Sequence, residues 1–137
     1  MIYTIADLRP GMSESLTRTV SDEDVALFAR VSGDDNPVHF DEAFAKNTIF
    51  RGRVAHGMLP ATYVSAVLGT RMPGPGTAFL SLTTRFKAPV RIGDTVTTTC
   101  TVRDVARRRV TFDCVCKVDD RIVMEGEAEV VPPAARS

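Results

Sequence analysis

The stretch from Gly57 to Leu68 (GMLPATYVSAVL) constrains the fold of this chain more than any other segment. Drawn as a helix it is apolar nearly all the way round, and a helix without a polar face has to be enclosed by the rest of the protein. Pro60 falls within the first turn, where its missing N–H costs nothing because those donors have no helical partner. We therefore expect a buried central helix with other elements packed around it.

The rest of the chain contains segments in which apolar and polar residues alternate. This alternation over residues 96–102, 110–118 and 122–130 predicts three strands, each with one apolar face. Two more strands are expected at 77–89 and 14–20. The short turns in the C-terminal half indicate antiparallel pairing, because parallel strands need long crossovers. A curved antiparallel sheet wrapped around the buried helix satisfies both patterns, so the expected fold class is α+β.

A second helical region precedes the central helix. Ser21 can cap its first turn, which is acidic as the helix dipole favours, and Gly33 can end it. Pro37 disfavours helical geometry in the residue before it, so residues 34–39 are expected to form a loop. Asp41 can cap a further short helix directly after this loop.

Length and composition indicate one domain. The 137 residues suit a single core over about 14–131, with a loose tail at 132–137. Lys plus Arg (17) equals Asp plus Glu (17), so no overall charge favours nucleic acid or a membrane surface. No basic leader and no apolar run of ~18 residues is found. The three cysteines argue against a disulfide framework, and we expect a cytoplasmic protein.

A carboxylate and an imidazole, Asp34 and His39, lie five residues apart on the loop that Pro37 stiffens. An acid–base pair needs such stiffness, because both groups must reach the same water or substrate atom. The same Gly-Asp-Asp-Asn-Pro run also suits ordinary turn chemistry, in which Asp and Asn side chains bond to their own backbone. Spacing alone leaves both interpretations open.

The wider pattern resembles the signature of the MaoC-like family, the (R)-specific enoyl-CoA hydratases. An aromatic residue, Phe28, is followed after two residues by Val31-Ser32-Gly33-Asp34, then any residue, then Asn36-Pro37-Val38-His39, and, after five intervening residues, the small Ala45. The resemblance continues through residues 52–58, 86–90 and 92–95, and it spans about 14–131. It implies a single hot-dog domain, which agrees with the sheet and enclosed helix expected from periodicity.

The resemblance also implies roles for individual residues. Asp34 and His39 would hold the catalytic water, and the backbone N–H of Gly57, at the opening of the central helix, would bind the thioester oxygen. Asn36 and Thr62 are the candidates for substrate binding, with Asn36 shaping the loop and Thr62 replacing a small hydroxyl residue of the relatives. No metal ligands are expected. No separate cofactor is expected either, because coenzyme A is part of the substrate.

The implied reaction adds water to a trans-2-enoyl-CoA and gives (R)-3-hydroxyacyl-CoA, reversibly, as in fatty-acid or polyhydroxyalkanoate precursor metabolism. It requires a base for the water, an acid for C2 and a donor for the thioester oxygen. The sequence does not decide which of Asp34 and His39 is the base. The alternatives are a dehydratase of acyl carrier protein thioesters, a hot-dog thioesterase, or a non-catalytic acyl-CoA-binding module. A thioesterase would leave the Asp34–His39 spacing unexplained.

Four further expectations concern residues outside this pair. His56 is interpreted as structural, and Cys114 and Cys116 as core residues rather than metal ligands. Edge strands left by the curved sheet favour a homodimer. The depth of the acyl pocket is expected to depend on residues of the central helix and the last strand: Tyr63, Val64, Val67, Leu68 and Val130.

Overall fold

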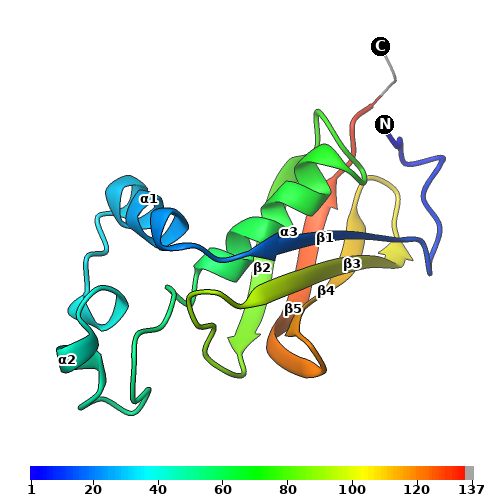
Figure 1. Cartoon of the computed structure of the whole chain (residues 1–137). Helices are drawn as coiled ribbons and strands as arrows, with labels where there is room; N and C mark the ends of the chain where they lie inside the picture. Colours follow the sequence, from blue (N-terminus) through cyan, green and yellow to red (C-terminus); the bar gives the residue numbers. More distant parts are fainter. Residues whose placement is uncertain (135–137) are drawn as a thin grey trace.

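The computed structural model describes residues 1–134, which form an antiparallel sheet of five strands crossed by one long helix (Figure 1). The strand order is β1-β3-β4-β5-β2, so β1 and β2 are the two edges. The α+β class and the antiparallel pairing predicted from alternation are confirmed. The strands are β1 (Ser13–Thr19), β2 (Ala78–Phe86), β3 (Thr95–Val105), β4 (Val110–Val118) and β5 (Arg121–Val131).

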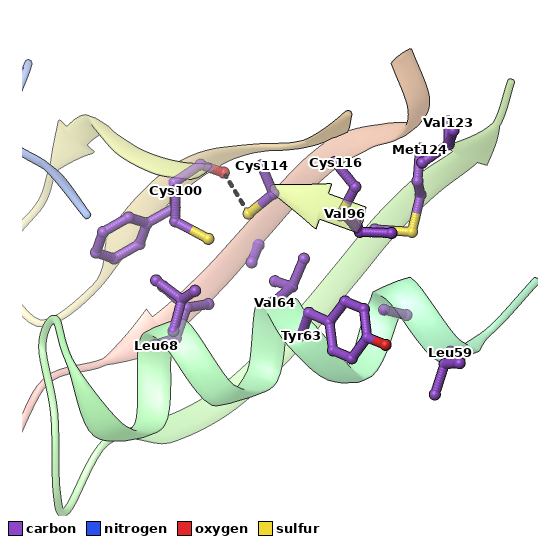
Figure 2. Close-up of a cluster of buried hydrophobic side chains, with 14 of the residues drawn as sticks. Leu59, Tyr63, Val64, Leu68, Val96, Cys100, Cys114, Cys116, Val123 and Met124 are labelled. Atoms are coloured by element: carbon purple, nitrogen blue, oxygen red, sulfur yellow. Dashed lines mark hydrogen bonds between the residues drawn. The ribbon is translucent and has the colours of Figure 1, made fainter. Parts of the chain in front are cut away.

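The long helix, α3 (Leu59–Thr70), packs its apolar side chains against the sheet. Figure 2 shows Val64 and Leu68 of α3 together with the sheet residues Cys100 and Cys114 in one buried cluster. Helix and sheet thus share a single main core, as the apolar character of both predicted.

Two details of α3 differ from the sequence-based expectation. The helix begins at Leu59, two residues after Gly57, so Gly57 lies in the preceding turn. The helix is not buried on every side: the face of α3 that the sheet does not cover exposes Thr62 and Ser65. The helix therefore keeps a narrow polar strip, which the nearly continuous apolar run concealed.

The three cysteines are free and buried among the core residues. Burial raises the pKa of the Cys116 thiol to about 11, so this group is a neutral thiol at physiological pH. The assignment of Cys114 and Cys116 to the core is confirmed.

The segment before α3 carries the helix α1 (Asp22–Ser32), a 3-10 turn, η1 (Pro37–His39), and the short helix α2 (Glu42–Ala45). In Figure 1, α1 and α2 lie to one side of the sheet. Ser21 caps α1 in a capping box with Asp24, as the sequence predicts. Gly33 ends α1 at φ 80°, a left-handed conformation that glycine adopts without strain. The predicted loop contains one unforeseen turn, η1.

One arginine fastens this segment to the body of the protein, and a second arginine holds its parts together. The guanidinium of Arg91 donates to the backbone carbonyls of Phe50 and Gly52 at 2.6 and 3.1 Å. Arg53 donates through Nε to the carbonyl of His39 at 2.8 Å and forms an ion pair with Asp22 of α1. These contacts fix η1 relative to α1 and to the loop that follows α2.

At the C-terminal end, Pro132 is buried and directly follows β5. The rest of the predicted loose tail includes residues 135–137, which lie outside the described residues. Within residues 1–134, no helix has the length and apolar character needed to cross a membrane.

Candidate active site

The loop between α1 and η1 is held in shape by its own side chains. The carboxylate of Asp34 accepts a hydrogen bond from the N–H of Asn36 at 3.3 Å, and the amide oxygen of Asn36 accepts one from the N–H of Val38 at 3.2 Å. Pro37 then begins η1, which ends at His39. The turn chemistry that competed with the acid–base interpretation is therefore present, and it presents Asp34 and His39 on one rigid loop.

His39 has a defined tautomer. Its Nδ1 lies 2.8 Å from the carbonyl oxygen of Val54, and this bond places the proton on Nδ1 and leaves the lone pair on Nε2. Burial lowers the pKa of His39, and His56 lowers it further, against the opposing effects of the Val54 hydrogen bond and the Asp34 charge. His39 is therefore a neutral imidazole at neutral pH, with Nε2 able to accept a proton.

Asp34 and His39 come close enough to share one water molecule. A carboxylate oxygen of Asp34 and ring nitrogens of His39 and His56 all lie within 4.8 Å of one another. A water that makes two hydrogen bonds of about 2.8 Å at a roughly tetrahedral angle spans about 4.6 Å. The geometry thus supports the predicted pair, and it adds His56 as a third member of the cluster.

The same three residues are the one set of potential metal ligands found within residues 1–134. One ring nitrogen of His39 bonds to the backbone carbonyl of Val54, and one ring nitrogen of His56 bonds to the backbone carbonyl of Asp34. A carboxylate together with two imidazoles can also form an acid–base site. The expectation that the protein uses no metal stays a prediction.

A cavity of about 380 Å³ opens beside His39, a size suited to a small-molecule group. His39 lines it directly, whereas Asp34 is exposed and is not part of its wall. The polar wall residues are Asn36, His56 and Lys87 in addition to His39. The apolar wall is formed by η1, the start of α3, the end of β2, the start of β5 and the loops before α3 and after β2. It includes Val38, Val54, Pro60, Phe86, Val90 and Val123.

Gly57 lies on the wall of this cavity, just before α3. Its backbone N–H donates to no acceptor within residues 1–134, so it is free to bind a ligand oxygen. A Cβ at this position would meet the ring of Phe86 at 3.6 Å, an ordinary contact, so the fold itself does not demand glycine here. The location fits the predicted oxyanion donor.

The remaining predicted substrate residues lie elsewhere. Thr62 is exposed on α3, donates to the carbonyl of Leu59 at 2.6 Å, and lines a separate groove, so its predicted contact with substrate stays a prediction. The expected determinants of pocket depth are buried core residues that do not line the His39 cavity of the single chain, so their role in acyl length stays a prediction: Tyr63, Val64, Val67, Leu68 and Val130.

His56 makes more contacts in the site than its interpretation as a structural residue anticipated. Its Nε2 lies 2.7 Å from the carbonyl oxygen of Asp34, and its ring stacks on that of His39 with centroids 3.7 Å apart. It also contacts the ring of Phe28 at 4.5 Å. The sequence carried one signal for this, because both Phe28 and His56 belong to segments that match the hydratase pattern.

Comparison with known proteins shows the family to which this chain belongs. The model of the MaoC like domain family matches residues 9–126. The chain belongs to the MaoC-like family, whose hot-dog fold the sheet and α3 reproduce.

Individual relatives cover nearly the full chain. An (R)-specific enoyl-CoA hydratase of Rhodospirillum rubrum is 48% identical over 136 residues, which are 98% of this chain and 94% of the relative. A 3-hydroxybutyryl-CoA dehydratase of Methylorubrum extorquens is 47% identical, over 93% of this chain and 82% of the relative. The unliganded R-hydratase PhaJ1 of Pseudomonas aeruginosa superimposes with a TM-score of 0.92 at 38% identity, covering 98% of this chain and 88% of that one.

Proposed function

We propose that this protein is an enzyme that adds water to trans-2-enoyl-CoA and forms (R)-3-hydroxyacyl-CoA, in a reversible reaction. The observation that carries the proposal is the approach of Asp34 and His39 within the reach of one water, next to a cavity that also exposes the N–H of Gly57. The name of the relative at 48% identity supports the same reaction and its (R) specificity, and the name of the relative at 47% identity supports the reverse reaction, a dehydration.

The geometry suggests an order for the proton transfers. His39 is neutral with a free Nε2, so we assign to it the first proton taken from the water, which Asp34 orients. The water oxygen bonds to C3 of the substrate, and the electrons of the double bond move toward the thioester oxygen. The N–H of Gly57 would stabilise this enolate oxygen. His39 then returns the proton to C2, so both new bonds form on the same face.

We further propose that the thioester is carried by coenzyme A and that no separate cofactor takes part. The cavity at His39 suits the reactive acyl end of such a substrate. Lys87 on its wall offers a cation for the negatively charged carrier. Three free, buried cysteines are compatible with a cytoplasmic location.

The exposed edge strand β2 supports a homodimer. Phe79 and Leu80 are 41% and 47% exposed on this strand, and unpaired edges of this kind are sites of strand pairing. Phe86 ends β2 on the wall of the His39 cavity. A second copy paired along β2 would therefore border the cavity, and we propose that the dimer completes the substrate site.

The test is an assay of the purified protein with enoyl-CoA substrates from C4 to C12. We expect loss of the enoyl absorbance with crotonyl-CoA, no release of free thiol, and a 3-hydroxyacyl product of the (R) configuration only. Release of free thiol at the rate of substrate loss would instead identify a thioesterase. Absence of turnover at every chain length would contradict the proposal and favour a binding module.

A further inference from the structure

We propose that His56 is a positioning residue that sets both members of the Asp34–His39 pair, through a hydrogen bond to the backbone of one and ring contact with the other. This inference rests on the proposed hydration reaction and deepens it. Ligand atoms of Asp34, His39 and His56 lie within 4.8 Å of one another, so His56 is the third member of this cluster. His39 and His56 are the two histidines of the chain.

The hydrogen bond to Asp34 defines the tautomer of His56. A carbonyl oxygen can only accept, so the 2.7 Å contact places the imidazole proton on Nε2. In the neutral ring Nδ1 then carries the lone pair, and this atom is buried and without a partner among the described residues. This bond ties the backbone of Asp34 to the residue just before Gly57, so the carboxylate and the proposed oxyanion donor are held at a fixed separation.

The ring of His56 links three parts of the chain. It contacts Phe28 of α1 at 4.5 Å and His39 of η1 at 3.7 Å between centroids, while its own backbone lies in the loop before α3. Only 2% of His56 is exposed. Its ring therefore keeps bulk water from the face of the His39 ring on which it stacks, and it restricts the rotation that would turn Nε2 of His39 away from the substrate.

This contact also bears on the charge of His39. The titratable and charged groups around His39 are Asp34 on its own loop, His56 before α3, Arg53, which donates to the His39 carbonyl, and Lys87 on the cavity wall. Burial lowers the pKa of His39, and His56 adds to that effect. A residue without a ring at position 56 would let bulk water reach the covered face of the His39 imidazole and favour the protonated form of His39.

Two substitutions separate the functions of His56. His56→Gln keeps an N–H that can reach the Asp34 carbonyl but removes the ring. His56→Phe keeps a flat ring against His39 but removes the donor. We expect His56→Gln to move the acidic limb of the hydration rate to higher pH. We expect His56→Phe to lower kcat by about 10- to 100-fold with little change in KM, because misplacement of a catalytic group by about 1 Å costs rates of this order.

Val67→Ala is the matched control. Val67 is fully buried in α3 and does not line the cavity, so its truncation destabilises the fold without touching the site. This variant should melt at a lower temperature than the wild type yet keep its kcat and its pH profile. A shift of the pH profile in Val67→Ala would mean that general destabilisation accounts for the behaviour of the His56 variants.

NMR of the two imidazoles tests the inference without an activity assay. In the wild-type protein, we expect the neutral form of each imidazole to carry its ring proton on Nε2 in His56 and on Nδ1 in His39. The single imidazole left in His56→Gln should titrate at a higher pH than His39 of the wild type. The opposite tautomer of His56, or an unchanged His39 titration, would overturn the inference. If the wild type itself fails to hydrate crotonyl-CoA, the proposed function fails, and the NMR result still decides the role of His56.

Discussion

Asp34 and its neighbour Asp35 provide a test at the scale of single residues. Both are exposed carboxylates, but only Asp34 lies within 4.8 Å of His39 and His56. Asp34→Asn and His39→Ala should each reduce crotonyl-CoA hydration by about 10²–10⁴-fold, the usual contribution of an acid–base group. Asp35→Asn should keep the wild-type rate.

The measurement is initial-rate kinetics combined with thermal melting of each variant. Asp34→Asn should melt near the wild-type temperature, because the amide oxygen can still accept the hydrogen bond from Asn36. Full activity in Asp34→Asn or His39→Ala, or an equal loss in Asp35→Asn, would contradict the assigned pair.

The protonation of His39 predicts the pH dependence of the reaction. Burial lowers its pKa below the ordinary value of 6.5, so the neutral base persists below that pH. The hydration rate, measured as kcat/KM, should therefore stay level as pH falls through 6.5 and decline only as pH passes through the lowered pKa. An acidic limb centred above 6.5 would show that His39 is not the proton acceptor.

At this scale the sequence placed Asp34 and His39 on one short loop with recognisable turn residues, and the family pattern then favoured an acid–base pair over ordinary turn chemistry. The position of Gly57 required the family pattern. His56 could not be assigned, since its contacts with Asp34 and Phe28 join parts of the chain that are 22 and 28 residues away along the sequence and close only in the fold.

Pairing of β2 with β5 depends on Gly126 and gives a prediction at the scale of elements. A Cβ at Gly126 would overlap the carbonyl oxygen of Thr83 on the neighbouring strand. Gly126→Ala should therefore displace β2 and lower the free energy of unfolding by on the order of 2–4 kcal/mol. Chemical denaturation measured by circular dichroism provides the check.

Gly69 is the matched glycine within α3. A Cβ there would meet nothing within 4 Å, so Gly69→Ala should raise the free energy of unfolding by roughly 0.5–1 kcal/mol through helix propensity. Equal stability of Gly126→Ala and the wild type would mean that β2 lies further from β5 than the structure has it.

Elements were predictable where a local period or cap defines them. The capping box at Ser21, the ending of α1 at Gly33 and the alternating strands all follow from residues near in sequence. The order of the strands and the exposed strip at Thr62 do not, because they depend on how far the sheet extends over α3.

At the scale of the whole molecule, residues at and beside the His39 cavity are open to solvent in a single chain. Asp34 is exposed, and Phe86, which forms part of the cavity wall, is 54% exposed at the end of the unpaired edge β2. Acid–base and oxyanion interactions are strongest where water is excluded. A second copy paired along β2 would supply that exclusion, so assembly and activity are expected to be coupled.

Leu80 tests this coupling, because it is 47% exposed at the irregular position of β2. A lysine on an edge strand opposes strand pairing, so Leu80→Lys should shift the protein from dimer to monomer and reduce hydration activity in parallel. Thr17→Lys, on the exposed edge β1, is the control and should stay dimeric and active. Sedimentation over a range of concentrations, with the crotonyl-CoA assay on the same samples, measures both quantities. A monomeric Leu80→Lys protein with wild-type activity would separate assembly from catalysis and place the complete site within one chain.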